Sequence, residues 1–412
     1  MNSLFQRHQL LGIAGAALTA LLIGCSGGES GTGMQANNQT TVGEISGFGS
    51  IYVNGVRYNT DGATVYIDGN PSSEQSLAVG MVVTVEGSVN SDGLNGTALT
   101  VATRTEVEGL VLQNDIAGNG TINVMGQTVK ISNDTKFKST VPTITVVDDL
   151  VANDSVVEVS GYSDGQGNIY ATYIKAVASG GSLSEIRLYG VIQELSGTTD
   201  NSTFRIGTVT VTFNDADTNF EDVTQSTLAN GMYVSVESTN YNNDIVLASE
   251  IDREDYIDRE GSEYELEGIV TDISSLANSE FKLNGRSVRF DTATIFEAGS
   301  QADIQLEVKL EVDGKVQADG LILADKISFR AESNMEIEGL VASKGDNMLT
   351  IGTTVIMVNE LTYYEDETDE NNRTFNFSDI IPGETTIEAK YYVDSGNGNN
   401  VATSIEKVML EP

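Results

Sequence analysis

The side chains of this 412-residue chain that could do chemistry are almost all carboxylates. The sequence has a single histidine, His8, and a single cysteine, Cys25, against 60 aspartates and glutamates. Histidine- or cysteine-dependent nucleophilic catalysis and zinc sites built from His and Cys therefore have no residues to work with after position 25. What remains is the chemistry of carboxylates, amides and hydroxyls, so we expect a protein that is not an enzyme.

The densest group of carboxylates lies near the C-terminus. The stretch "YYEDETDENNR" places five acids in six positions, namely Glu365, Asp366, Glu367, Asp369 and Glu370. Calcium takes six to eight oxygen ligands, and this segment supplies them densely. The stretch lacks the regular spacing and distal glutamate of an EF-hand loop. Two interpretations stay open: a calcium site, which would be the only cofactor, and a solvated acidic loop.

A second charged stretch, "DREDYIDREGSEYELE", alternates acids with Arg253 and Arg259. Mixed charges of this kind could form a cation or partner site, or a linker laced with ion pairs between two folded units. We favour the linker.

The N-terminus has the features of an export signal. Arg7 is the only fixed charge of the first 24 residues, and about 15 apolar residues follow, too few to favour a membrane span. The segment "LIGC", ending at Cys25, resembles the lipobox of bacterial lipoproteins. The resemblance implies that Cys25 becomes the acylated first residue and that several acyl chains hold it in the membrane. Ser26, where an Asp would imply inner-membrane retention, implies the outer membrane. The alternative is an ordinary cleaved signal with a chance cysteine.

The strongly acidic balance limits the partners of the chain. The formal net charge is −38, and removal of the leader with its Arg7 makes it −39. Such a charge opposes binding to phosphate backbones, so nucleic acid is excluded as a partner. The charge suits either a solvated surface in a salty medium or a preference for cations.

The chain repeats one pattern five times. The opening motif of each unit contains a glycine, as in "VEGLV", "LEGIV" and "IEGLV", and the five are Gly43, Gly109, Gly190, Gly268 and Gly339. Subtraction gives spacings of 66, 81, 78 and 71 residues, each the size of a very small domain. We therefore expect five tandem domains after the leader.

Within each unit the signals are those of short strands. An apolar run ends on Asn-Gly or X-Gly, as in "IYVNGVRY" and "FKLNGRSV", which predicts a tight hairpin. A third segment alternates apolar and polar residues, as in "VVTVEG". The fourth reads Ala-x-x-Ile or Ala-x-x-Val, starting at Ala98, Ala171, Ala248, Ala324 and Ala402. A small residue at a fixed strand position indicates close packing rather than a functional site.

These patterns predict an all-β chain of five small, five-stranded antiparallel barrels that resemble OB domains. A small β-sandwich is the alternative, although sandwiches usually need about seven strands. Short linkers predict a semi-rigid rod or arc. The expected divisions are a leader (1–24), a flexible tether (25–41) and barrels over 42–104, 105–178, 185–252, 263–330 and 335–412.

The motifs "EGxV", "NGxxV", "GxxVxVEG" and "AxxI" resemble those of bacterial lipoproteins built from repeated small β domains of unassigned function. The resemblance implies a fold and a cell-envelope location, and it supplies no catalytic residue. We expect a non-enzymatic, lipid-anchored protein whose domains form a binding or scaffolding rod, with an envelope protein or a glycan as partner. The alternative is a carbohydrate-active or calcium-dependent glycan-binding protein that uses paired carboxylates.

Overall fold

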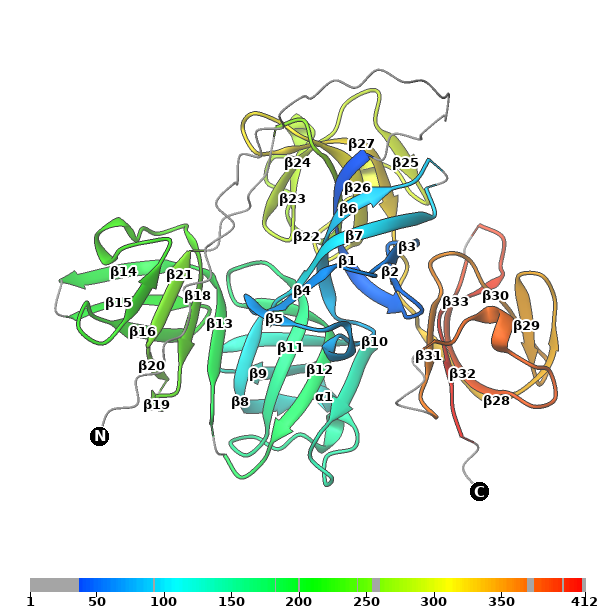
Figure 1. Cartoon of the computed structure of the whole chain (residues 1–412), viewed down its shortest axis with the longest axis horizontal. Coiled ribbons are helices and arrows are strands. Elements are labelled where there is room, and N and C mark those ends of the chain that lie inside the picture. The colour runs from blue at the N-terminus through cyan, green and yellow to red at the C-terminus, as the bar shows by residue number, and fades with distance from the viewer. Residues whose placement is uncertain are drawn as a thin grey trace, which may run out of the picture.

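The computed structural model describes residues 37–91, 93–181, 183–198, 201–242, 244–253, 260–368, 374–394 and 396–409. Five small β-barrels account for nearly all of these residues, as the sequence predicted (Figure 1). The leader and Cys25 lie outside the described residues, as do Asp369, Glu370 and Arg259. No described helix combines the length and apolar character needed to cross a bilayer.

Barrel 2 shows the topology that all five share. It contains β8 (Val107–Asp115), the helix α1 (Ile116–Asn119), β9 (Thr121–Val124), β10 (Gln127–Ser139), the 3-10 turn η2 (Val147–Asp149), β11 (Val156–Ser163) and β12 (Asn168–Ala178). β8 pairs with β9 and β11, β9 pairs with β10, and β11 pairs with β12, all antiparallel. The ring closes through a parallel pairing of β10 with β12. A closed ring of five strands cannot alternate direction throughout, so the expectation of antiparallel pairing holds for four contacts and fails at the fifth.

The other barrels repeat this order, with the third strand and sometimes the first or fifth broken into two pieces. Barrel 1 contains β1 (Asn37–Gly47), β2 (Ile51–Val53), β3 (Val56–Asn59), β4 (Thr64–Ile67), β5 (Asn70–Ser72), η1 (Glu74–Ser76), β6 (Val82–Val89) and β7 (Asn95–Thr103). Barrel 3 contains β13 (Ile186–Val191), β14 (Gln193–Thr198), β15 (Asn201–Ile206), β16 (Val209–Phe213), β17 (Asn219–Glu221), η3 (Gln225–Thr227), β18 (Tyr233–Ser238), β19 (Tyr241–Asn242), β20 (Ile245–Leu247) and β21 (Glu250–Arg253).

The last two barrels complete the chain. Barrel 4 contains β22 (Glu263–Asp272), η4 (Leu276–Asn278), β23 (Glu280–Leu283), β24 (Arg286–Arg289), β25 (Ile295–Glu297), η5 (Gln301–Asp303), β26 (Lys309–Val316) and β27 (Ile322–Phe329). Barrel 5 contains β28 (Met335–Lys344), β29 (Met348–Ile351), β30 (Thr354–Met357), β31 (Tyr363–Asp366), η6 (Phe377–Asp379), β32 (Thr386–Val393) and β33 (Asn400–Lys407).

The predicted tight hairpins form where the sequence reads Asn-Gly. In barrel 1 the turn between β2 and β3 consists of Asn54 and Gly55, with φ angles of 51° and 81°. Two successive positive φ angles define the type I′ turn that joins twisted strands, and Asn-Gly adopts it most readily. The turn therefore sets the register of this hairpin.

The Ala-x-x-Ile motif marks a β-bulge in the fifth strand. In barrel 2 the register between β11 and β12 shifts at Gly161, which pairs with Ala171, so that Thr172 is the extra residue. The same shift occurs at Ala98, Ala324 and Ala402. The motif alanines are buried, and the bulge bends the strand around a barrel too small to close without it. The packing interpretation of these alanines is confirmed.

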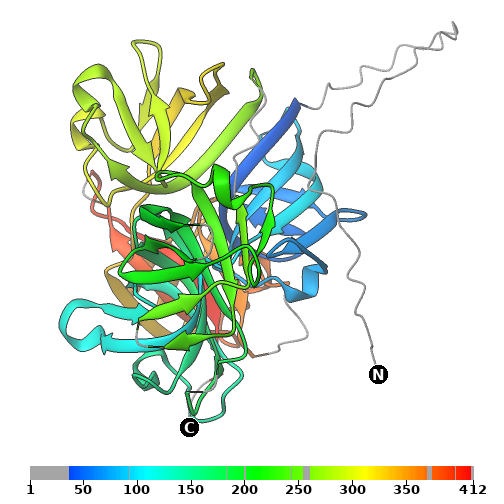
Figure 2. The same ribbon diagram turned by 90° about the vertical axis from the view of Figure 1, so that its left-hand side faces the viewer.

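The barrels do not follow one another as a rod, contrary to the sequence-based expectation. β1 of barrel 1 pairs in parallel with β22 of barrel 4, and β8 of barrel 2 pairs antiparallel with β13 of barrel 3. Barrels 2 and 3 also share one continuous hydrophobic cluster. Figure 2 shows the resulting cluster of barrels from the side. Strand edges join barrels 1 and 4 and barrels 2 and 3, and each of these pairings satisfies backbone groups that a rod would leave free.

The predicted tether also ends earlier than expected. Residues 37–41 already belong to β1, where Gln39 and Thr41 lie opposite Glu263 and Glu265 of β22. Backbone pairing needs no apolar side chain, so the polar composition of this segment led to the wrong prediction of a tether where a strand forms.

Candidate functional site

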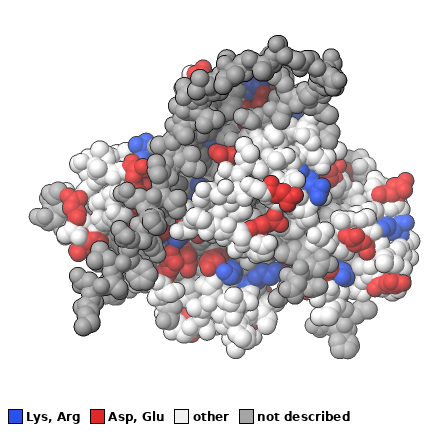
Figure 3. Space-filling view, in the orientation of Figure 1, with Lys and Arg blue, Asp and Glu red and all other residues white. Residues whose placement is uncertain are grey.

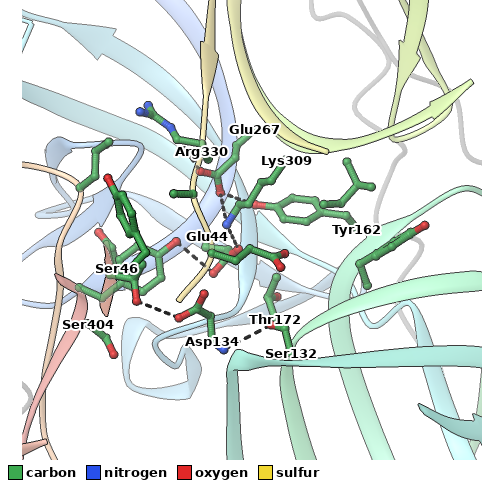
Figure 4. A pocket seen from close by; sticks show the side chains of 18 of the residues that line it. Glu44, Ser46, Ser132, Asp134, Tyr162, Thr172, Glu267, Lys309, Arg330 and Ser404 are labelled. Atoms are coloured by element: carbon green, nitrogen blue, oxygen red, sulfur yellow. Dashed lines mark hydrogen bonds and ion pairs between the residues drawn. The ribbon is translucent and has the colours of Figure 1, made fainter. Parts of the chain in front are cut away.

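A pocket of about 610 Å³ lies where barrels 1, 2, 4 and 5 meet. Within the described part of the chain, barrel 3 contributes none of its lining. No single repeat could form this pocket, because its walls are the outer faces of four barrels. Figure 4 shows side chains from these barrels pointing toward one another across it.

A lysine ammonium group lies at the centre of the polar wall. Lys309 Nζ, from β26, is 2.5 Å from Glu44 Oε1 of β1 and 3.4 Å from Glu267 Oε1 of β22 (Figure 4). Tyr363 of β31 donates its hydroxyl to Glu44 Oε2 at 3.0 Å, and Tyr162 of β11 donates to Glu267 Oε1 at 2.5 Å. One ion network, which we call the junction network, therefore joins barrels 1, 2, 4 and 5.

Strand alternation places these acids on the outside of their own barrels. On β1, Ile45 enters the core of barrel 1 while Glu44 faces the other way. On β22, Leu266 enters the core of barrel 4 while Glu267 faces out. Both glutamates are nevertheless about 95% buried, because neighbouring barrels cover them. A surface position of one barrel becomes an interior position of the assembly.

Burial and charge move the two glutamates in opposite directions. Burial raises the pKa of Glu44, even though Lys309 opposes the change. Burial would also raise the pKa of Glu267, but Lys309 and Arg330 outweigh it and the pKa is lowered. Burial likewise opposes the charge of Lys309, yet the two carboxylates hold its pKa well above the ordinary value. Two carboxyl groups with divergent acidity thus share one pocket, an arrangement that suits acid–base chemistry as well as a structural ion network.

The rest of the lining is polar and aromatic. Lys130 Nζ is bound to Glu307 at 2.6 Å and lies 4.6 Å from the ring centre of Tyr170. Asp134 accepts a hydrogen bond from the backbone N–H of Ser333 at 2.8 Å and one from Thr403 Oγ1 at 2.9 Å. Tyr392 adds a further ring to the wall. The lining offers hydroxyls, carboxylates and ring faces to a ligand, whereas its cations already have partners.

A second buried group of acids lies at the contact between barrels 1 and 4. One carboxylate oxygen from each of Glu265, Glu311 and Asp313 lies within 4.8 Å of the other two, which is close enough for the three to bind one cation. Gln39 and Thr41 donate to Glu265 at 2.9 and 3.1 Å. Arg330 is bound to Glu311, and Lys326 lies 2.7 Å from Asp313. The three carboxylates thus already have hydrogen-bond donors or cationic side chains of the protein as partners, and we assign no ion to them.

The predicted acidic segment is divided between two lysines. Glu365 and Glu367 each lie 3.3 Å from Lys138 of barrel 2. Asp366 lies 2.7 Å from Lys407 and accepts hydrogen bonds from Thr368. Asp369 and Glu370 lie outside the described residues, so the calcium site stays a prediction. Melting the protein in millimolar calcium and in chelator checks it, and an unchanged midpoint would remove the calcium hypothesis.

The junction network and the pocket were not found from the sequence. A signal was present: Lys309 is the single basic residue of "IQLEVKLEV", and Glu265 and Glu267 alternate on the first strand of the same unit. Nothing in that pattern indicates that these residues meet Glu44, which lies more than 200 positions earlier. Figure 3 shows the described surface as a mixture of acidic and basic side chains, which gives no hint of the buried group either.

The pKa of Glu108, which lies opposite Arg187 in the β8–β13 pairing, predicts a pH dependence of stability. Burial raises this pKa from 4.5 to about 7, and Glu185 and Glu158 add to the effect. The folded chain holds the proton more tightly than the unfolded chain, so the free energy of unfolding should fall as the pH rises from about 4.5 to about 7. Glu108→Gln should flatten this part of the curve. The midpoints of thermal unfolding at pH 5 and pH 7.5 test this. An equal difference between the two midpoints in the wild type and in Glu108→Gln would contradict it.

The fold and the pocket define a class of protein: a tandem array of OB-like barrels joined into one assembly. Comparison with protein families gives the particular family. The chain belongs to the family described as a domain of unknown function (DUF5666), which it matches five times, over residues 41–104, 108–175, 189–252, 267–328 and 338–406. The expected five tandem repeats are confirmed. No curated protein matches the sequence.

Proposed function

We propose that this chain is a non-enzymatic protein of the cell envelope, anchored by lipid at Cys25, whose barrels form a scaffold around a ligand-binding pocket. The observation that carries the proposal is the pocket of about 610 Å³ shared by four barrels. Binding sites in proteins are few, concave and often placed between domains. The leader and the lipobox-like "LIGC" support the anchor, and Ser26 favours the outer membrane.

The physical advantage of this design is rigidity. Buried ion pairs between the four barrels and the β1–β22 pairing of barrels 1 and 4 hold them in one arrangement, so a ligand meets a pocket that is already formed. Lys136 of barrel 2, for example, is bound to Glu406 of barrel 5, with both side chains almost wholly buried. The acidic surface keeps the assembly away from nucleic acid and anionic lipid.

The anchor is tested by metabolic labelling with an alkyne fatty acid. We expect the wild-type chain to incorporate the label and to sediment with membranes. Cys25→Ser should lose both properties, because the acyl chains that hold the chain in the membrane attach at Cys25. Ser26→Ala is the matched control and should be labelled like the wild type. Labelling of Cys25→Ser, or its absence from wild type, would contradict the lipid anchor.

A second candidate is glycan binding, with hydrolysis as its extreme form. The observation that favours it is the combination of four tyrosines, Tyr162, Tyr170, Tyr363 and Tyr392, with Glu44 and Glu267 around one pocket. Tyrosine presents an apolar ring and a polar hydroxyl, as sugar rings require. Paired carboxyl groups of unequal acidity are also the machinery of glycoside hydrolases.

A glycan array distinguishes these candidates. Binding by wild type that Tyr392→Ala abolishes, without release of sugar, supports a glycan-binding scaffold. Release of sugar that Glu44→Gln abolishes, with the protein still folded, would show a hydrolase and overturn the non-enzymatic proposal. Absence of binding to every glycan would remove the second candidate and leave the scaffold with a different ligand.

A further inference from the structure

The first strand of every barrel has an edge that its own barrel leaves unpaired. In barrel 5, β32 pairs with one side of β28 over residues 335–340, from Met335 opposite Tyr391 to Leu340 opposite Thr386. The second strand, β29, pairs only with the later part of β28, from Val341 onward. The other side of residues 335–340 therefore presents backbone N–H and C=O groups without a partner strand from barrel 5.

The other four barrels use this same edge to join one another. In barrels 1 and 4 it forms the parallel pairing of β1 with β22 over four residue pairs. In barrels 2 and 3 it forms the antiparallel pairing in which Val107 lies opposite Leu188. In each pairing both strands are first strands of their units. Among the described residues, no strand pairs with the equivalent edge of β28, so barrel 5 is the odd member of the set.

Side chains beside this edge are exposed in barrel 5 and buried in barrel 4. Relative to the glycine of the repeat, Met335 and Leu340 occupy the positions of Tyr264 and Ile269. The barrel 5 residues are 44% and 43% exposed, whereas those of barrel 4 are 6% and 2% exposed. An exposed strand edge flanked by apolar residues is a template for another strand, and proteins usually pair, cover or blunt such an edge.

The charge of the edge indicates what kind of strand would fit. Glu336 and Glu338 are exposed on β28 and correspond to Glu265 and Glu267 of barrel 4. The carboxylates of barrel 4 are served by donors and cations, among them Thr41 of β1 and Lys309. The carboxylates of β28 face solvent instead.

The β8–β13 pairing shows which side chain can lie opposite such a glutamate. Glu108, which corresponds to Glu338, lies opposite Arg187 of barrel 3 in this pairing. We propose that β28 binds an extended segment of another protein that carries Lys or Arg at alternate positions, which adds as a strand beside residues 335–340. The proposal extends the scaffolding role but depends on neither the lipid anchor nor the pocket.

A second copy of the chain fits this edge poorly. In a symmetric antiparallel pair of β28 strands, residues that face the same way must lie opposite one another. The two registers that pair five of residues 335–340, centred on Ile337 or on Glu338, bring Glu336 or Glu338 opposite a glutamate of the other copy, and directly opposed like charges destabilise a sheet. The edge therefore favours a basic strand over itself.

The test uses the full chain in detergent and synthetic peptides of alternating Lys and Val or alternating Glu and Val. We expect the Lys-Val peptide to slow amide hydrogen exchange in residues 335–340 and to bind at least about tenfold more tightly than the Glu-Val peptide. The double variant Glu336→Lys/Glu338→Lys should reverse this preference. Glu384→Lys, an exposed change elsewhere in barrel 5, is the matched control and should leave it intact.

Because the whole chain is acidic, a basic peptide could also bind by charge alone. A Lys-Val peptide methylated on alternate backbone nitrogens separates the two effects, since it keeps its charge but cannot add as a strand. Equal binding of the methylated and unmethylated peptides would overturn the proposal. It would also fail if the chain formed dimers that Glu336→Lys/Glu338→Lys dissolved, which would assign the edge to a second copy. Circular dichroism verifies that both variants fold.

Discussion

Replacement of Lys309 by methionine is expected to lower the free energy of unfolding by about 3–5 kcal/mol. The change removes the ammonium group that is bound to both Glu44 and Glu267 and leaves two buried carboxylates without it. Removing one partner of a buried ion pair costs more than the pair contributed, because the remaining charge keeps its desolvation penalty. The loss should appear in urea unfolding as an earlier transition of the barrels that meet at the junction.

Lys315→Met is the matched control, since Lys315 lies on the same strand and is bound to Glu263 at 3.1 Å on the surface. Water screens that pair, so its loss should barely move the transition. A rescue variant makes the argument sharper: Glu44→Gln added to Lys309→Met should recover part of the stability, because it removes one uncompensated charge. Equal stability of Lys309→Met and Lys315→Met would contradict the central role of the junction network.

The second large effect is expected at the bulge of barrel 2. A Cβ atom added to Gly161 would lie less than 3.0 Å from the carbonyl oxygen of Tyr170. Real Cβ atoms essentially never come so close to another atom. The obstacle is backbone of the paired strand and cannot rotate away, so β11 and β12 would have to separate. We expect Gly161→Ala to cost about 3 kcal/mol, at the upper end of overpacking changes.

Gly47→Ala provides the comparison for this variant. A Cβ atom at Gly47 would meet its nearest atom, the carbonyl oxygen of Tyr364, at an ordinary 3.5 Å. Thermal unfolding followed by circular dichroism should show a marked drop in midpoint for Gly161→Ala and little change for Gly47→Ala. Similar midpoints for the two variants would mean that the bulge tolerates a side chain and that close packing is not the reason for a glycine at position 161.

The two variants also separate the two levels of organisation. Gly161→Ala acts on the closure of one barrel, which the repeat pattern specifies. Lys309→Met acts on the contact of four barrels, which depends on residues of several units. If the pocket is the functional site, Lys309→Met should weaken ligand binding even at temperatures where every barrel remains folded.

The sequence alone determined the repeated unit. Alternation of apolar residues, Asn-Gly turns and the Ala-x-x-Ile bulge are local signals, because neighbouring strands of one barrel lie within about 70 residues of each other. The Asn-Gly pair at Gly55 predicted the hairpin turn, and the Ala-x-x-Ile motif at Ala171 predicted close packing. Both predictions used only residues a few positions apart in the chain. The repeat count followed from the same signals, since each unit repeats them in the same order.

Tertiary structure alone decided how the barrels associate and where the pocket lies. Glu44 and Lys309 are 265 positions apart, and each looks like a solvated surface residue within its own strand. Whether such a residue is buried depends on which outer face of a barrel meets which other. The free edges of the first strands decide this for barrels 1 and 4 and for barrels 2 and 3, and side-chain pairs such as Lys136–Glu406 join barrel 5 to the rest. Alternation along a strand tells the inside of a barrel from its outside, but it carries no information about what covers the outside.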